Sequence, residues 1–322
     1  MSGVLDRRDF IKLLGAGMAG VFSMAAAPGP FAGRSDEEKT ILFLSDTQAP
    51  MFWETLILPR TRNDEARQKI LELVLGEADP AAVFHLGDVV ARASEEEDWK
   101  PIDDFLTRLR ARKVPVYGAM GNHEYLLTST EGAAGFKKRF PEFPQSRFSV
   151  RLVPLAFIVL NSNFGELSGA ARAEQKKYYE EQMAAFENDP EVKGVVVCAH
   201  HPPFTNSKMV NGSFELERDF VPLFLKSRKA KLFLSGHSHA AEHFIKGGKP
   251  FLVLGGGGGL LHPLYLGSEA RHEDYFPLRT RRRWFHYLRL QTNSEGWRAT
   301  FRMLRQDLGS WVDIYAIAGA WD

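Results

Sequence analysis

The segment LFLSGHSH, residues 232–239, places an apolar, strand-like run directly before two histidines. Four other segments repeat this arrangement: LFLSDTQ (42–48), VFHLGD (83–88), VYGAMGNHE (116–124) and VVVCAHHP (195–202). Each begins with aliphatic, β-branched or aromatic residues, which are typical of a buried strand. Each ends with side chains that bind metal ions. The sequence therefore predicts strands that are followed by candidate ligands.

Helical stretches lie between several of these strands. We expect helices over residues 64–78, 95–112, 172–188 and 215–228. Alternation of strand and helix predicts a layered α/β domain. In such sheets ligands bind outside the carboxyl ends of the strands, and all five segments carry their polar residues at that end. We therefore expect one site that gathers residues from all five segments.

The side chains after the strands suit divalent metal ions. Carboxylate and amide oxygens suit manganese and magnesium, whereas neutral imidazole suits zinc and iron. His237 and His239 are two residues apart, so both side chains point the same way in an extended segment. Two adjacent divalent ions on such a scaffold are the machinery of phosphate-ester hydrolysis.

As a set, the segments resemble the calcineurin-like metallophosphoesterase superfamily, which includes purple acid phosphatases and cyclic-nucleotide phosphodiesterases. The blocks of that family read D-x-H, G-D, G-N-H-E/D, H-x-P and G-H-x-H. The matching residues here are Asp46-Thr47-Gln48, Gly87-Asp88, Gly121-Asn122-His123-Glu124, His200-His201-Pro202 and Gly236-His237-Ser238-His239. The resemblance covers roughly residues 40–260. It implies an α/β fold, a layered α/β/β/α sandwich, in a single domain over residues 40–322.

The resemblance also implies a role for each matching residue. Asp88 would bridge two divalent ions, which could be Mn, Zn, Fe or Mg. Asp46 and His239 would complete the first ion, and Asn122, His200 and His237 the second. A hydroxide held between the ions would attack the phosphorus of a small-molecule phosphate ester. His123 is the candidate catalytic residue that donates a proton or a hydrogen bond during this reaction, and Glu124 is a candidate to orient it.

Gln48 is the one departure from the family blocks, because many relatives have a histidine at this position. An amide oxygen is neutral and binds zinc or iron more weakly than imidazole does. Gln48 is therefore expected to bind the first ion loosely, to favour manganese, or to act through a water. Purple acid phosphatases use a tyrosine three residues after the bridging aspartate, but Ala91 occupies that position here.

The segments between the blocks are expected to choose the substrate. His201, Thr205, Asn206 and Trp53 are the candidate substrate-binding residues. His201 either lines the pocket or packs beneath it. Five glycines, residues 255–259, either form a rim of the site with His262 or make a tight turn. The tail over residues 284–312 alternates polar and apolar residues, which predicts a closing β-hairpin rather than a second domain.

The composition fits a soluble enzyme, with 322 residues, of which 44% are hydrophobic and 25% charged. The net charge of +1 gives no field that favours a nucleic acid polymer or a membrane. The single Cys198 permits no intramolecular disulfide.

The N-terminal residues predict an export signal. Arg7 and Arg8 precede Asp9-Phe10-Ile11-Lys12 and a Gly/Ala-rich stretch, which resembles a twin-arginine signal peptide over residues 1–27. Residues 28–39 would be a linker. We expect recognition by the twin-arginine export machinery, a periplasmic or secreted bacterial location, and no stable membrane insertion after cleavage.

Two other functions are considered as alternatives to metal-dependent phosphate-ester hydrolysis. A catalytically weak ligand-binding protein on the same scaffold is motivated by Gln48 alone. A β-lactamase-like metallohydrolase would need an H-x-H-x-D-H cluster, which the chain lacks. The choice between phosphomonoester and phosphodiester stays open, because no motif encodes the width of the pocket.

Overall fold

The computed structural model describes residues 38–141 and 147–321 of the chain. The predicted signal peptide and most of the predicted linker lie outside these residues. Within the described residues, none of the helices is both long enough and apolar enough to cross a membrane.

Two six-stranded mixed sheets form the centre of the fold. In order across the first sheet, the strands are β12 (Trp311–Ala320), β11 (Gly296–Leu304), β10 (His286–Thr292), β1 (Lys39–Leu44), β2 (Ala82–His85) and β3 (Val116–Gly118). Across the second sheet they are β4 (Phe148–Leu152), β5 (Leu155–Leu160), β6 (Gly194–Ala199), β7 (Ala230–Ser235), β9 (Lys249–Leu254) and β8 (Ala241–Lys246). Neighbouring strands are parallel from β1 to β3 and from β5 through β6 and β7 to β9, so each sheet has several carboxyl ends at one edge.

The two sheets pack face to face through aromatic side chains. The ring centroid of Phe157 on β5 lies 4.7 Å from that of Phe84 on β2 and 6.1 Å from that of Phe43 on β1. Successive side chains of a strand point to opposite faces. Accordingly Phe157 belongs to the core between the sheets, whereas its neighbour Ile158 packs in a second core with Tyr179 of the helix behind the sheet. Burial on both faces explains why these strands are uninterrupted apolar runs.

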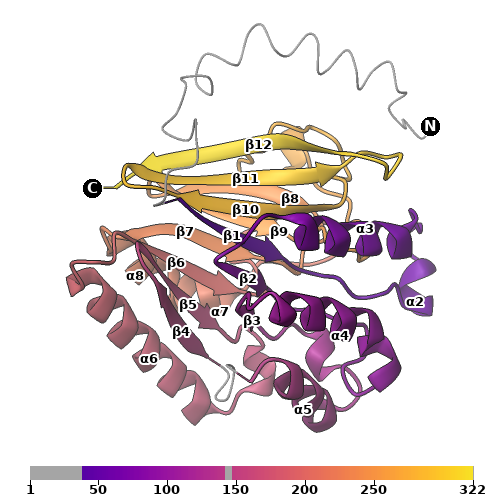
Figure 1. Ribbon diagram of the computed structural model, residues 1–322, viewed down its shortest axis with the longest axis horizontal. Helices are drawn as coiled ribbons and strands as arrows, with labels where there is room; N and C mark the ends of the chain where they lie inside the picture. The colour runs from indigo at the N-terminus through magenta and orange to yellow at the C-terminus, as the bar shows by residue number, and fades with distance from the viewer. Residues whose placement is uncertain (1–37, 142–146, 322) are drawn as a thin grey trace, which may run out of the picture.

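Helices cover the outer faces of both sheets. The α-helices are α2 (Phe52–Thr55), α3 (Asn63–Gly76), α4 (Glu96–Ala111), α5 (Ser129–Arg139), α6 (Gly169–Asn188), α7 (Phe214–Asp219) and α8 (Val221–Lys226). Short 3-10 turns occupy η3 (His123–Tyr125), η4 (Phe164–Glu166) and η5 (Gly267–Glu269). Figure 1 shows α3 and α4 beside β1 to β3, with α6 along the far side of β4 to β6. This arrangement confirms the predicted α/β/β/α sandwich in a single domain.

Three of the four predicted helices match α3, α4 and α6 to within a few residues. The fourth prediction is wrong as a continuous helix, because residues 215–228 form α7 and α8 with a break at Phe220. Pro222 follows that break, and proline is tolerated only in the first turn of a helix because it has no N–H. The predicted tail hairpin is β10 with β11, and β12 adds a third antiparallel strand.

Candidate metal centre

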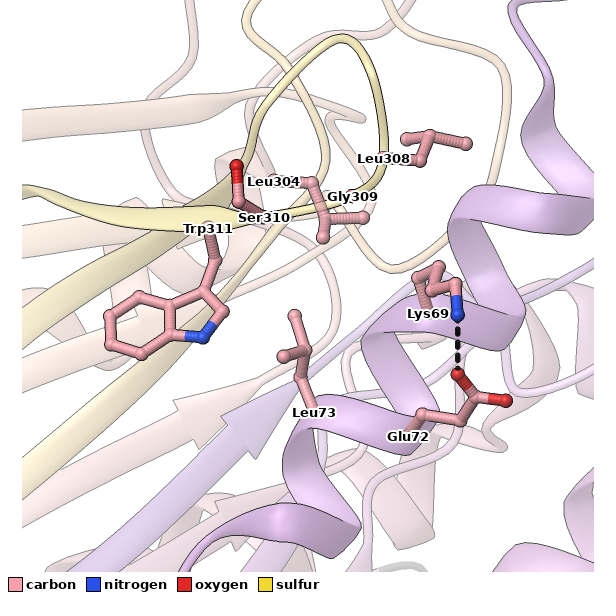
Figure 2. A pocket seen from close by; sticks show the side chains of 8 residues that line it. All are labelled: Lys69, Glu72, Leu73, Leu304, Leu308, Gly309, Ser310 and Trp311. Carbon is pink, nitrogen blue, oxygen red and sulfur yellow. Dashed lines mark hydrogen bonds and ion pairs between the residues drawn. The ribbon is translucent and has the colours of Figure 1, made fainter.

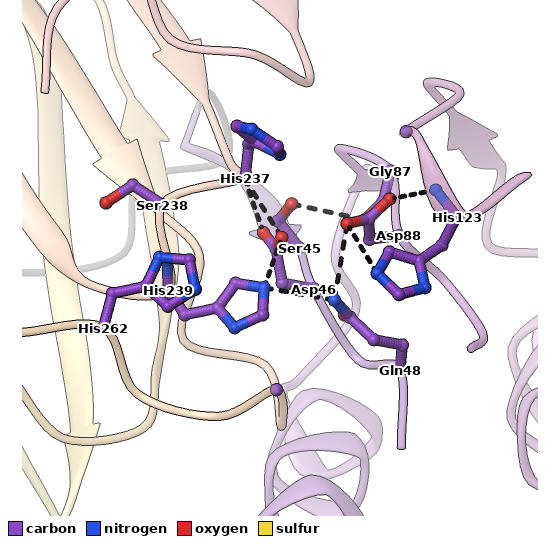
Figure 3. A network of polar contacts seen from close by, with 12 residues as sticks. Ser45, Asp46, Gln48, Gly87, Asp88, His123, His237, Ser238, His239 and His262 are labelled. Carbon is purple, nitrogen blue, oxygen red and sulfur yellow. Dashed lines mark hydrogen bonds and ion pairs between the residues drawn. The ribbon is translucent and has the colours of Figure 1, made fainter. Parts of the chain in front are cut away.

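Residues from both sheets meet where the parallel strands end. They are Asp46 and Gln48 after β1, Asp88 after β2, Asn122 and His123 after β3, His200 and His201 after β6, and His237 and His239 after β7. Figure 3 shows much of this network, with Asp46 and Asp88 between the flanking histidines. The fold therefore brings the ends of five strands to one place.

A first group of ligand atoms comes from Asp46, Asp88 and His239. One such atom from each residue lies within 4.8 Å of the other two. His239 Nε2 lies 3.3 Å from Asp46 Oδ1, while Nδ1 lies 2.8 Å from the carbonyl oxygen of Leu260. A carbonyl can only accept, so Nδ1 carries a proton and Nε2 is the atom that faces the group. The ring is thus oriented as a metal-binding histidine usually is.

A second group comes from His200, His201 and His237, whose ligand atoms also lie within 4.8 Å of one another. His200 Nδ1 lies 2.8 Å from the carbonyl oxygen of Leu86, which again turns Nε2 toward the group. Asn122 Oδ1 lies 3.2 Å from that Nε2 atom. The structure therefore places the amide oxygen of Asn122 beside this second group.

Asp88 connects the two groups. It is a member of the first, and its Oδ2 lies 3.3 Å from His200 Nε2 in the second. Asp88 and Asp46 are both almost fully buried. Burying two carboxylates side by side is costly unless cations or protons accompany them.

The pKa values of nearby groups show how that cost is met in the protein alone. Burial would raise the pKa of Asp88, but His200 and His123 beside it lower the pKa well below its usual value. Burial would lower the pKa of His200, but the Asp88 carboxylate raises it to about 9. Without metal, a proton on His200 thus balances part of the negative charge. Metal ions would take over that role and release the proton, so this donor set fits a divalent metal centre.

The backbone at the centre is held in unusual conformations. Asp46, Asp88 and His237 have left-handed φ angles of 60°, 51° and 64°. Such conformations are sparsely populated for residues other than glycine and concentrate at functional sites. Gly121 permits a close approach, because a Cβ atom there would lie 2.2 Å from Asp88 Oδ1. The loops are therefore shaped around the two aspartates.

The side chain of Gln48 is buried within the first group. In one amide orientation Nε2 donates to Asp88 Oδ2 at 3.3 Å and lies 3.1 Å from His239 Nε2. In the flipped orientation Oε1 lies 3.1 Å from His239 Nε2, and Nε2 donates to the backbone carbonyls of Asp88 at 3.0 Å and Asp46 at 3.2 Å. The amide oxygen then faces the group and the nitrogen faces away. Direct binding of a metal ion by Gln48 stays a prediction that this orientation favours.

His123 lies at the other side of Asp88. Its Nδ1 lies 2.9 Å from the carbonyl oxygen of Ala91, and its Nε2 lies 3.9 Å from Asp88 Oδ2. Glu124 does not orient this ring as expected. Burial, and then the charge of Asp88, raise the pKa of Glu124 to about 7. Its carboxylate accepts hydrogen bonds from the backbone N–H groups of Asp88, Val89 and Gly121.

The candidate substrate-binding residues lie in different surroundings. His201 lies beside the second group, with its ring centroid 4.2 Å from that of His237. Thr205 and Asn206 are buried instead. The Thr205 hydroxyl and the backbone N–H of Asn206 donate to the carboxylate of Glu242, and the Asn206 side chain hydrogen-bonds to the backbone of His272. Trp53 is 51% exposed on the short helix α2. Substrate contact by Thr205 and Asn206 stays a prediction, although their side chains already have partners within the protein.

Sequence reasoning missed the contacts that support the histidines. Ser162, at the end of β5, accepts a hydrogen bond from the backbone N–H of His201, and its hydroxyl lies 2.9 Å from His201 Nδ1. His262 stacks on His239 at 4.3 Å between ring centroids. The proximity of His262 to the glycine run was the only signal for this second contact, and no motif marks Ser162.

Cavities at the surface of the described residues differ in how close they lie to the centre. One has a volume of about 430 Å³ and includes His201 in its wall, so it adjoins the second group. Another, of about 230 Å³, lies between α3 and the loop joining β11 to β12 (Figure 2). Its lining, which includes Lys69, Leu73 and Trp311, contains none of the candidate ligands, so we assign the chemistry to the first cavity and the adjoining centre.

Known structures share this fold at low sequence identity. Purple acid phosphatase PPD1 from yellow lupin seeds is 17% identical, with a TM-score of 0.65 over 89% of this chain and 54% of that chain. GAP50, the anchor in the inner membrane complex of Plasmodium, is 11% identical, with a TM-score of 0.65 over 89% of this chain and 90% of that chain. A dimetal phosphatase from Danio rerio is 14% identical, with a TM-score of 0.53 over 89% of this chain and 100% of that chain. The chain thus spans about half the length of the lupin phosphatase.

No curated protein matches the chain. A family model does match it: the model of the calcineurin-like phosphoesterases covers residues 39–241, a range that contains every candidate ligand. The chain belongs to the calcineurin-like phosphoesterase family.

Proposed function

We propose that the protein hydrolyses a small-molecule phosphate ester in a centre that holds two divalent metal ions. The observation that carries this proposal is the position of Asp88, which belongs to one ligand group and lies 3.3 Å from His200 in the other. A shared carboxylate offsets the repulsion between two adjacent cations. When bound, the two ions would supply Lewis acidity and a hydroxide nucleophile at neutral pH. The Danio rerio neighbour is itself described as a dimetal phosphatase.

The proposed ligands divide between the two ions as the two groups suggest. Asp46, His239 and Gln48 would hold the first ion, and Asn122, His200 and His237 the second, with Asp88 shared. Two divalent ions against the two buried aspartates leave a net positive charge. That charge would attract the anionic phosphate ester.

Two further histidines would act on the substrate. His123, whose Nδ1–H donates to the carbonyl oxygen of Ala91, would donate from Nε2 to the leaving oxygen in its doubly protonated, imidazolium form. The Ser162 hydroxyl can donate to His201 Nδ1, which leaves the proton on Nε2 at the edge of the second group. In that tautomer His201 would donate a hydrogen bond to a phosphoryl oxygen.

The experiment is metal removal and replacement. The metal-free protein would be resupplied with manganese, zinc, iron or magnesium, and hydrolysis of p-nitrophenyl phosphate compared with that of bis-p-nitrophenyl phosphate. We expect metal-dependent turnover that Asp88→Asn abolishes and that Asp104→Asn, at an exposed position on α4, leaves intact. Turnover by a folded, metal-loaded Asp88→Asn protein at the parent rate would overturn the two-metal proposal.

A second candidate function is a catalytically weak binding protein on the same scaffold. Gln48 motivates it, and the Plasmodium neighbour is described as an anchor. Absence of turnover with one ion or none bound would favour this candidate, and Gln48→His should then restore binding of the first ion. Absence of turnover with two bound ions would instead indicate a narrow substrate pocket.

We also propose that the chain is exported in the folded state by the twin-arginine machinery and acts in the periplasm or outside the cell. Arg7 and Arg8 motivate this proposal. Replacing both with lysine should trap the protein in the cytoplasm, as measured by cell fractionation; unchanged export would refute it.

A further inference from the structure

The cavity beside the second histidine group has a distinctive lining. Its volume is about 430 Å³. Its lining includes Asn163, Phe164, Glu166, His201, Phe214 and Glu215. Because His201 lies beside His237 and also forms part of this wall, the cavity opens next to the centre. A phosphate ester held at the centre would extend its alcohol part into this cavity.

One wall offers a hydrogen-bond acceptor on a largely buried side chain. Asn163 is 6% exposed, and its Nδ2 donates to the carbonyl oxygen of Met120 and to Asn161 Oδ1, both at 2.9 Å. These two bonds fix the amide orientation, so the remaining side-chain atom is the acceptor Oδ1. Among the described residues, no donor is recorded for that oxygen. A ligand that donates would satisfy it.

The charges of the lining are all negative. Glu166 and Glu215 contribute carboxylates, and the lining contains no lysine or arginine. Within the described residues, neither carboxylate forms an ion pair with a basic side chain. The guanidinium of Arg218 lies over the Phe214 ring at 5.1 Å; it pairs with Asp219 and also interacts with the charge of Glu215. The lining itself therefore carries net negative charge, which favours a cationic group over a further phosphate.

Two aromatic rings complete the lining. Phe164 is buried and Phe214 is 63% exposed. The face of an aromatic ring attracts a cation, and most strongly where carboxylates add to the field. The acceptor, the carboxylates and the aromatic rings together favour a positively charged guest over a neutral or anionic one.

We propose that this cavity binds the alcohol part of the substrate and selects a small alcohol that carries an ammonium group. The inference rests on the proposed phosphoesterase function and names the substrate class of that site. Glu166 and Glu215 are specificity-determining residues in this account, and Asn163 accepts a hydrogen bond from an N–H of the ammonium group.

The test compares phosphoethanolamine with propyl phosphate, in which a methyl group replaces the ammonium group. For the metal-loaded protein we expect kcat/KM to favour phosphoethanolamine by about tenfold at low salt, and less at high salt. Glu166→Gln with Glu215→Gln should bring the ratio close to one. The matched control, Glu174→Gln with Glu217→Gln, removes the same charge outside the cavity and should keep the preference. Equal turnover of both esters by the parent protein would overturn the inference while leaving the phosphoesterase function standing.

A binding measurement separates the two claims further. Saturation-transfer NMR on the metal-free protein would compare ethanolamine with propan-1-ol. We expect ethanolamine to bind, and binding to be lost in the double variant of the cavity but not in the control. Ethanolamine binding without turnover of any ester would keep the cavity assignment and defeat the proposed function. Failure of ethanolamine to bind to the parent protein would defeat the cavity assignment.

Discussion

Replacing Gly121 with alanine should disturb the centre through a single added methyl group. A Cβ atom at this position would lie 2.2 Å from Asp88 Oδ1 and 2.4 Å from the backbone nitrogen of Asp88. Real Cβ atoms essentially never approach another heavy atom within 3.0 Å, so the two loops must separate by about 0.8 Å. Gly121 is not in the left-handed region, so the penalty comes from this contact alone.

The structure gives the size of both effects. Overpacking against backbone costs about 1–3 kcal/mol of stability, which lowers the melting temperature by about 2–10 °C for a chain of this size. Ligand bonds to zinc are about 2.0–2.2 Å long, so a displacement of 0.8 Å takes the Asp88 carboxylate out of bonding position. Loss of a contact that supports a ligand lowers metal affinity by roughly 10–100-fold. We expect a decrease at least as large when the ligand itself is displaced.

Two measurements on one pair of variants test this reasoning. Calorimetry of the metal-free protein gives the melting temperature, and competition with a chelating dye gives manganese affinity. The matched control is Gly76→Ala at the end of α3, where an added Cβ atom would meet nothing within 4 Å. The control should gain about 0.4–1 kcal/mol and bind manganese as the parent does. Parent-like stability and affinity in Gly121→Ala would refute the account of how Asp88 is held.

Three further predictions concern other parts of the site. Gln48→His should tighten binding of the first zinc ion by about tenfold or more, because imidazole binds zinc better than an amide does; dye competition measures this, and unchanged affinity would place Gln48 away from the ion. The metal-free protein should lose thermal stability as the pH rises from about 6.5 to 9. The pKa of His200 is raised to about 9 beside Asp88 in the folded protein, so its proton stabilises the fold, and this stabilisation is lost as the proton leaves. The metal-loaded protein should not lose stability in this way, since bound ions replace the proton; calorimetry at the two pH values decides. Trp53→Ala should change stability by no more than about 0.5 kcal/mol, because the side chain is 51% exposed, and should raise KM without changing kcat if Trp53 contacts the substrate.

Much of the fold followed from local pattern. The strands that precede the candidate ligands are buried on both faces, so each is an apolar run that ends in polar residues. β12 escaped prediction because it lies at the edge of its sheet, with many half-buried residues and weak alternation. The hairpin of β4 and β5 escaped because no ligand-like segment follows it to mark its end. Pro222 indicates the break between α7 and α8, but the helical pattern on both sides of it led to the prediction of one continuous helix.

The supporting contacts of the centre could not be predicted because they join distant loops. Glu124 follows the candidate catalytic His123 in sequence, which suggests a side-chain partner next door. In the fold it accepts from three backbone N–H groups, and two of them belong to the loop after β2. Ser162 reaches His201 only because β5 and β6 are adjacent and parallel. Such partners depend on strand order, which no single segment encodes.

The central claim, a pair of ions that share Asp88, is tested most directly by anomalous X-ray diffraction from crystals loaded with manganese. We expect two anomalous peaks about 3.5–4 Å apart, with the Asp88 carboxylate between them. One peak should lie beside Asp46 and His239 and the other beside His200 and His237. A single peak, or two peaks that do not share Asp88, would contradict the account.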